Sequence, residues 1–402
     1  MVENKMPRDI FELLEKSVNE KIENFEVKQH EGNKKGEGFL GDLLFISLKN
    51  KTSKEDHHFV IKQVLPSNHE TNKNWMSASY LNEIYMYMKI IPTFQEFQKN
   101  CQNIKIFDNV PKCYAALSEK CNEKILLENI KFKNYVLHPK KQLINSKMYE
   151  KIFQLYGKFH AISFAFKQQR PELFSELVSN LKNNWPAFTT LILYKSITNA
   201  VNRIKRILES RNEEKLLKRF LNYMDNGLDI FKNSIQYKDS YGVIIHGDCW
   251  SNNLMFKYNS AREIEDIKLI DFQMSLLGSP VHDLSYTFYS GASKEALDNL
   301  EELLKIYHTT LSEHLKHYGL NAEKVYPFAV MKEEWRKYCS FGFIMGMLIW
   351  GAKNIEDGHV PDLNEVIDDK NKFQNYNIKI DHKNYDGPIC NLIKHMCDNN
   401  FI

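Results

Sequence analysis

The stretch that decides the fold is His246-Gly247-Asp248-Cys249-Trp250-Ser251-Asn252-Asn253, which follows the apolar run at residues 241–245. A second apolar run, residues 267–270, leads in the same way into Asp271-Phe272-Gln273. Each run predicts a short buried strand with an aspartate at its end. A carboxylate placed there is held more firmly than one on a free loop, so the two runs predict a site built around Asp248, Asn253 and Asp271.

These residue types suit phosphoryl transfer, which needs a carboxylate to accept the proton of the attacking hydroxyl, oxygen ligands for Mg²⁺ and a cation for the donor phosphates. Asp248 can be the base. Asn253 and Asp271 offer the hard oxygen atoms that Mg²⁺ prefers. Lys62 can supply the cation, and Glu83, on a predicted helix, can hold that lysine by an ion pair.

The chain upstream of this stretch predicts mostly strands. A glycine-bearing segment at 31–42 is followed by strand-like runs at 43–48, 59–65, 111–117 and 124–130. Residues 75–90 have helical apolar spacing, and Pro92 is expected to end that helix. Glycine has no Cβ, so a loop rich in it can approach phosphates closely. The candidate phosphate-loop residues are Gly36, Gly38 and Gly41.

Beyond about residue 130 the pattern changes to long amphipathic helices, predicted at 147–168, 197–232, 293–317 and 332–352. A strand-rich unit therefore precedes a helix-rich unit of about twice its size. We expect an α+β protein with two lobes, residues 1–130 and residues 131–402.

The overall composition excludes several classes of protein. Of 402 residues, 43% are apolar and 26% charged, which is typical of a soluble globular protein. The net charge of +3 gives no basic field for nucleic acid. Seven cysteines without a CxxC pair argue against a disulfide scaffold or a zinc ribbon. The longest apolar run, residues 341–351, is about half the length of a membrane span. With no apolar segment at the start, we expect a cytoplasmic protein. From the sequence we infer no obligate protein partner.

The longer pattern resembles the ecdysteroid kinase-like family, also called CHK kinase-like, whose relatives are aminoglycoside phosphotransferases and choline kinases. The resemblance rests on residues 246–256, on Ile270-Asp271-Phe272-Gln273 and on Gly278-Ser279-Pro280-Val281-His282-Asp283-Leu284. It continues upstream through the glycine-bearing segment, 59–65, Glu83, 126–128 and 157–163. It implies a bilobal protein-kinase-like fold, with a small antiparallel-sheet N-lobe and a large helical C-lobe.

The resemblance also implies a role for each matching residue. Asp248 matches the catalytic aspartate, Asn253 and Asp271 the metal ligands, Lys62 the ATP-phosphate lysine and Glu83 its helix partner. The hinge that reads adenine through its backbone matches the segment Glu128, Asn129 and Ile130. Three residues depart from the family pattern, none of them a metal ligand: Gly38 replaces Asn, Gly41 replaces Ser or another small residue, and Asn129 replaces Asp.

The resemblance implies an ATP- and Mg²⁺-dependent kinase that phosphorylates a hydroxyl of an apolar small molecule, such as an ecdysteroid or a plant secondary metabolite that is being detoxified. One alternative is a choline- or aminoglycoside-type kinase with a cationic acceptor. Another is a pseudokinase that only binds ligands, although Lys62, Asp248 and Asp271 are all retained.

Two further segments bear on the choice of acceptor. The aromatic residues of 341–350 are expected in the core and could also line the acceptor pocket. An acidic stretch at 354–369 could attract a cationic acceptor, but Gly358 and Pro361 suggest an exposed loop whose charges are solvated.

Overall fold

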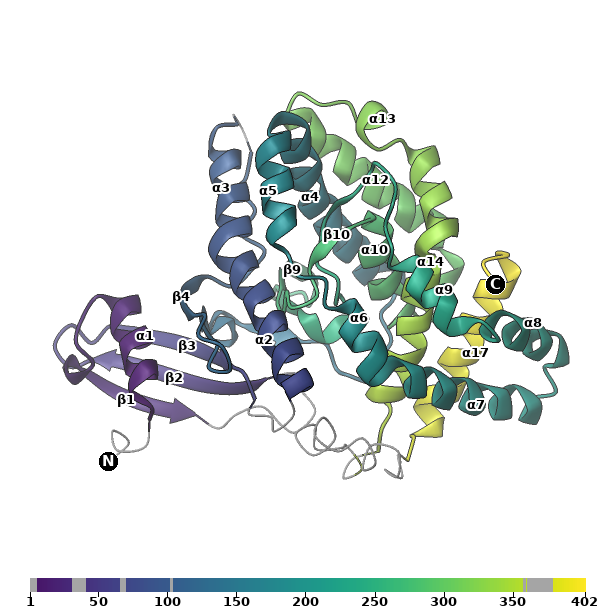
Figure 1. Cartoon of the computed structure of the whole chain (residues 1–402), viewed down its shortest axis with the longest axis horizontal. Coiled ribbons are helices and arrows are strands. Elements are labelled where there is room, and N and C mark those ends of the chain that lie inside the picture. Colours follow the sequence, from purple (N-terminus) through teal and green to yellow (C-terminus); the bar gives the residue numbers. More distant parts are fainter. Residues whose placement is uncertain (1–5, 31–40, 66–69, 102–103, 357–358, 360–378) are drawn as a thin grey trace.

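The computed structural model describes residues 6–30, 41–65, 70–101, 104–356, 359 and 379–402. Its N-terminal part contains one antiparallel sheet of five strands in the order β1-β2-β3-β5-β4, shown in purple and blue in Figure 1. The strands are β1 (Phe25–His30), β2 (Asp42–Asn50), β3 (Asp56–Gln63), β4 (Cys113–Leu117) and β5 (Lys124–Glu128). Central strand β3 pairs with both β2 and β5.

One long helical segment runs from α2 (Glu70–Tyr85) through the π-helical turn η2 (Met86–Ile90) into α3 (Ile91–Lys99). The prediction that Pro92 ends the helix was wrong. The N–H of Ile91 bonds to the carbonyl of Met86, five residues earlier, and this wider turn accommodates the proline at the start of α3.

The C-terminal part is mainly helical, as Figure 1 shows in teal, green and yellow. Its central helices are α4 (Ser146–Gln169), α10 (Pro280–Tyr289), α12 (Leu300–His317) and α14 (Phe328–Lys353). The single helix expected over 197–232 is divided into α7 (Tyr194–Ser210), α8 (Glu214–Met224) and α9 (Gly227–Ser234). Remaining elements are α1 (Arg8–Val18), η1 (Ile22–Asn24), η3 (Ile130–Lys133), α5 (Pro171–Asn180), α6 (Trp185–Phe188), η4 (Thr189–Leu193), α11 (Lys294–Asp298), α13 (Ala322–Val325) and α17 (His382–Asp398).

Two small sheets place the loops that carry Asp248 and Asp271 against these helices. Strand β7 (Val243–Ile245) pairs with β10 (Leu276–Gly278). Strands β6 (Tyr135–Leu137), β8 (Leu254–Tyr258) and β9 (Ile264–Leu269) form the other sheet, and η5 (Ser251–Asn253) precedes β8. The two predicted strands that lead into Asp248 and Asp271 are β7 and β9, and they belong to different sheets. The loops that follow these strands link the two sheets.

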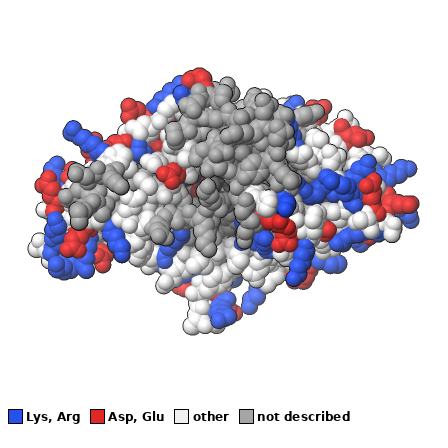
Figure 2. All heavy atoms as spheres, turned by 90° about the horizontal axis from the view of Figure 1, so that it is seen from below, with Lys and Arg blue, Asp and Glu red and all other residues white. Residues whose placement is uncertain are grey.

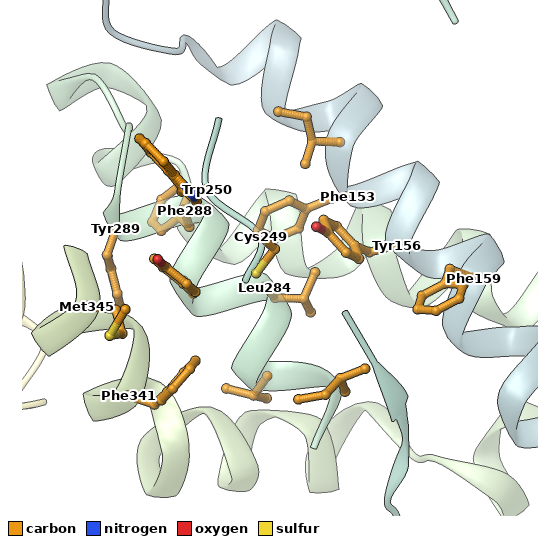
Figure 3. Close-up of a cluster of buried hydrophobic side chains, with 14 of the residues drawn as sticks. Phe153, Tyr156, Phe159, Cys249, Trp250, Leu284, Phe288, Tyr289, Phe341 and Met345 are labelled. Carbon is orange, nitrogen blue, oxygen red and sulfur yellow. The ribbon is translucent and has the colours of Figure 1, made fainter. Parts of the chain in front are cut away.

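A dense aromatic core lies beneath these loops. Figure 3 shows Cys249 and Trp250 close to rings from α4 (Phe153, Tyr156) and α10 (Phe288), with Phe341 of α14 farther away. Close packing of this kind holds a loop in one conformation, because any shift opens a cavity or creates a clash. The core therefore supports the loop from the helical side.

The expected α+β architecture is confirmed, with an antiparallel sheet in the N-terminal part and a mainly helical C-terminal part. None of the described helices is long and apolar enough to cross a membrane. On the described part of the face seen in Figure 2, basic and acidic side chains are interspersed.

Candidate active site

Lys62 lies at the centre of the predicted charge cluster. It is on β3, between Leu43 of β2 and Ile125 of β5. Its Nζ lies 2.7 Å from Oε2 of Glu83 on α2 and 2.9 Å from Oδ1 of Asp271. The side chains of Lys62 and Glu83 are 10% and 1% exposed and that of Asp271 is 27% exposed, so the cluster opens to solvent on the Asp271 side.

The pKa values of Lys62 and Glu83 depend on each other. Burial alone would lower the pKa of Lys62, but the carboxylates of Asp271 and Glu83 outweigh it and raise that pKa. Burial raises the pKa of Glu83, and the ammonium of Lys62 opposes the rise. Lys62 is therefore a fixed positive charge at the end of the sheet that faces the loops.

Asp248 and Asn253 lie on the loop between β7 and β8. The amide nitrogen of Asn253 donates to the carbonyl oxygen of Asp248 at 2.6 Å and to its Oδ2 at 3.0 Å. This arrangement uses both N–H groups of Asn253, which leaves its Oδ1 for another ligand. Because Asn253 lies five residues after Asp248, these bonds close a tight loop around the carboxylate of Asp248.

Asp283 of α10 holds this loop from beneath. Its carboxylate is fully buried and accepts the backbone N–H of His246 at 2.8 Å and of Gly247 at 2.9 Å. Its third partner is Nε2 of His160, at 3.2 Å. Gly247 has φ +84°, and a Cβ there would lie 2.2 Å from the carbonyl oxygen of Met274, so glycine is required.

His246 ties the two aspartate loops together. Its Nε2 lies 2.9 Å from the carbonyl oxygen of Ile270, directly before Asp271, and its Nδ1 accepts the N–H of Asp248 at 3.2 Å. Burial lowers the pKa of His246, which keeps the ring neutral. A neutral ring can donate on one side and accept on the other, as both bonds require.

Sequence reasoning missed Tyr286. Its buried hydroxyl donates to Oδ1 of Asp248 at 2.9 Å from α10, three residues after Asp283. The signal was present, because residues three apart share a helix face, and Asp283 belongs to one of the motifs on which the resemblance rests. Burial, with the charge of Asp271 added, raises the pKa of Asp248 to about 7, and the bonds from Tyr286 and Asn253 oppose the rise.

One cavity of about 1050 Å³, counted out to its mouth, brings these residues together. Lys62, Glu83, Asp248, Asn253 and Asp271 all line it. Its other walls are mostly apolar and come from both lobes: Leu43, Phe45, Val60, Pro111, Leu127, Leu137, Trp250, Met255 and Ile270. The cavity has the charged end and the apolar slot that a nucleotide requires.

The predicted hinge lines the same cavity through Glu128, Asn129 and Ile130. The N–H of Glu128 bonds to the carbonyl of Lys112, and that of Asn129 to the carbonyl of His58. The side chain of Asn129 accepts the N–H of Lys131 and so caps η3. Asn and Asp both cap in this way, which explains why asparagine is tolerated here.

Of the three phosphate-loop glycines, Gly36 and Gly38 lie outside the described residues. Gly41 lines the cavity, but a Cβ at this position would lie 2.0 Å from the hydroxyl oxygen of Tyr80. That hydroxyl donates to the carbonyl oxygen of Gln63 at 2.6 Å. The tyrosine therefore explains why this chain has glycine where a larger residue was expected.

The donor atoms present fit Mg²⁺. Asp271 offers a carboxylate and Asn253 an amide oxygen, and both are hard oxygen ligands. Mg²⁺ keeps waters and substrate phosphates as further ligands, so two protein ligands suffice. Among the described residues no cluster of three or more His, Cys, Asp or Glu could hold a metal.

The two segments considered for the acceptor give little information. Phe341 and Trp350 are 1% and 2% exposed, so the aromatic residues of α14 belong to the core. Most of the acidic stretch, including Asp362, Glu365, Asp368 and Asp369, lies outside the described residues.

Comparisons with known proteins give one family match over most of the chain and two weak structural likenesses. The model of the ecdysteroid kinase-like family matches residues 35–320. No curated protein matches the chain. Among solved structures, the GDP complex of a mutant aminoglycoside 2′-phosphotransferase IIIa is 12% identical, with 93% of this chain and 92% of that chain covered and a TM-score of 0.36. The GDP and kanamycin complex of APH(2″)-IIIa is 11% identical, with 81% and 92% covered and a TM-score of 0.35. These scores are too low to inform the function of this chain.

Proposed function

Because this chain belongs to the ecdysteroid kinase-like family, we propose that it is a small-molecule kinase that uses ATP and Mg²⁺ to phosphorylate a hydroxyl group. The observation that carries the proposal is the position of Lys62. Its ammonium bridges Glu83 and Asp271 at the wall of a cavity that Asp248 and Asn253 also line. A phosphate-binding cation, a base and two oxygen ligands thus face one space.

In the proposed reaction Asp248 orients the acceptor hydroxyl and takes its proton as the oxygen attacks the γ-phosphorus. The bond from that phosphorus to the β–γ bridging oxygen breaks, and ADP leaves. Lys62 neutralises charge on the donor phosphates. Asn253 and Asp271 would hold Mg²⁺, which supplies further positive charge to the phosphates when bound. Leu43, Val60, Leu127 and Met255 would enclose the adenine.

We further propose an apolar acceptor that bears a hydroxyl, such as a polycyclic steroid. The family resemblance supports this choice, as does the presence of Trp250 in the lining of the cavity, two residues after Asp248. The buried aromatic residues of α14 do not contribute to it.

The test is an ATP-consumption screen of the purified full chain with Mg²⁺ against steroids, polyphenols, glucosides and amino alcohols, with the product mass measured. We expect an acceptor-dependent product 80 Da heavier for at least one apolar alcohol, as one transferred phosphoryl group requires. Faster turnover of choline or an aminoglycoside, suppressed by salt, would assign the cationic acceptor instead. ATP binding without turnover of any acceptor would favour a binding module.

A further inference from the structure

Asn82 lies next to Glu83 on α2 and is 1% exposed. Its amide nitrogen donates to the carbonyl oxygen of Gln273 at 3.1 Å and to that of Ser275 at 2.7 Å. Its amide oxygen accepts the N–H of Lys182 at 3.0 Å. One buried side chain therefore links the helix of the ion pair to two backbone segments about 100 and 190 residues away in the sequence.

The segment that Asn82 holds is the one that carries Asp271. Asp271 has φ +68°, a conformation that costs a non-glycine residue free energy and persists only where neighbouring contacts enforce it. Two residues of α2 make such contacts with the backbone directly after Asp271. Glu83 accepts the N–H of Phe272, and Asn82 binds the carbonyl groups of the next turn.

Gln273 adds a link within the charge cluster. With its amide nitrogen turned toward Asp271, it donates to Oδ1 of Asp271 at 3.2 Å and accepts from Nζ of Lys62 at 3.2 Å. The carbonyl of the same residue is the one that Asn82 binds. Moving this backbone would therefore disturb both sides of the Lys62–Asp271 pair.

We propose that Asn82 is a positioning residue that holds α2 and the segment 271–275 in register, so that Lys62, Glu83 and Asp271 are assembled before the nucleotide binds. This inference rests on the proposed kinase function, but the contact itself can be tested without turnover.

The experiment compares Asn82→Ala with two controls in the full-length protein. Ser79→Ala removes a buried hydroxyl on the same helix that donates only to Trp75, within α2. Asn184→Ala removes another bond to the carbonyl of Gln273, at 3.1 Å, from outside α2. We expect Asn82→Ala to lower kcat about 100-fold, since a displacement of about 1 Å has that effect. The acceptor KM should be unchanged, and both controls should stay within about threefold of wild type.

A double-mutant cycle separates positioning from general loss of stability. If Asn82 acts through the ion pair, adding Asn82→Ala to Glu83→Gln should lower kcat by less than threefold. Full additivity of the two losses would overturn the proposal. So would a kcat of the folded Asn82→Ala variant within threefold of wild type.

Hydrogen–deuterium exchange provides the readout that does not depend on activity. Asn82→Ala should raise exchange in 271–275, whereas Ser79→Ala should not. If the wild type binds no ATP, the proposed function fails, while this comparison still tests the link. Unchanged exchange in 271–275 overturns the link whatever the activity. Should Asn82→Ala fail to fold, Asn82→Asp keeps the acceptor for Lys182 while removing the amide donor, and the same outcomes apply.

Discussion

The hydroxyl of Tyr286 donates to Oδ1 of Asp248 at 2.9 Å, while the amide of Asn253 binds Oδ2 at 3.0 Å. Each oxygen of the proposed base is thus held from a different side, one by α10 and one by its own loop. The carboxylate can rotate only if one of these bonds breaks.

We expect Tyr286→Phe to lower kcat by about 10- to 100-fold, because a hydrogen bond to a charged group contributes about 1.5–3 kcal/mol. The nucleotide Kd should be unchanged. Tyr149→Phe is the matched control, since its buried hydroxyl donates only to the carbonyls of Thr287 and Phe288. Equal losses of kcat in both variants would show that the effect is one of folding.

Asp248→Asn should lower kcat by about 10²–10⁴-fold, the usual contribution of a general base, with nearly intact nucleotide affinity. Steady-state kinetics and calorimetric ATP titration measure the two quantities. A variant that turned over at close to the wild-type rate would show that another group accepts the proton.

Asp271→Asn should weaken ATP binding in the presence of Mg²⁺ far more than in its absence, because a neutral amide supplies no charge to the metal. Calorimetry with and without Mg²⁺ measures the difference. Lys62→Met should weaken ATP binding under both conditions, because the lost charge faces the phosphates. An Asp271→Asn variant with unaltered Mg²⁺ dependence would rule out this residue as a ligand.

Gly41→Ala should lower the melting temperature, since the added methyl group collides with the hydroxyl of Tyr80 and overpacking costs about 1–3 kcal/mol. Adding Tyr80→Phe removes the colliding atom. The double variant should therefore be more stable than the sum of the two single losses predicts. Strict additivity would mean that the collision is relieved elsewhere.

Lys353 gives a prediction about pH. It is 1% exposed, between the rings of Trp250 and Trp350, and its Nζ donates to the carbonyl of Ser290. Burial, with repulsion from Lys140, lowers its pKa to about 7. The unfolded chain binds a proton up to about pH 10.4 and the folded chain only to about 7, so stability should rise across this range. Melting curves from pH 6.5 to 9.5 should show the rise in wild type relative to Lys353→Met, and parallel curves would contradict it.

The sequence alone leads to candidate residues whose chemistry is tied to a local pattern. Asp248 and Asp271 were found because each ends an apolar run, and Lys62 because it interrupts one. The structure places all three along one cavity.

Contacts made across the fold could not be predicted in this way. Asn82 is an ordinary helix residue in the sequence, and only the tertiary structure brings it to Ser275. The need for glycine at position 41 likewise depends on Tyr80, which reaches it from another element. The prediction for Pro92 was wrong because proline usually ends a helix, whereas the π-helical turn before it provides space for the proline ring.

Because of that turn, α2 and α3 form one continuous helical segment. At its C-terminal end Phe94 and Phe97 contact Phe166 of α4, at ring-centroid distances of 5.4 and 5.2 Å. The helix that bears Glu83 is therefore tied at one end to the helical part of the chain and at the other to the sheet region, through Tyr80 to Gln63 and Ser77 to Glu123. It connects the two parts and does not belong to either alone. A fragment that ends at residue 130 would leave those phenylalanines facing water and should aggregate.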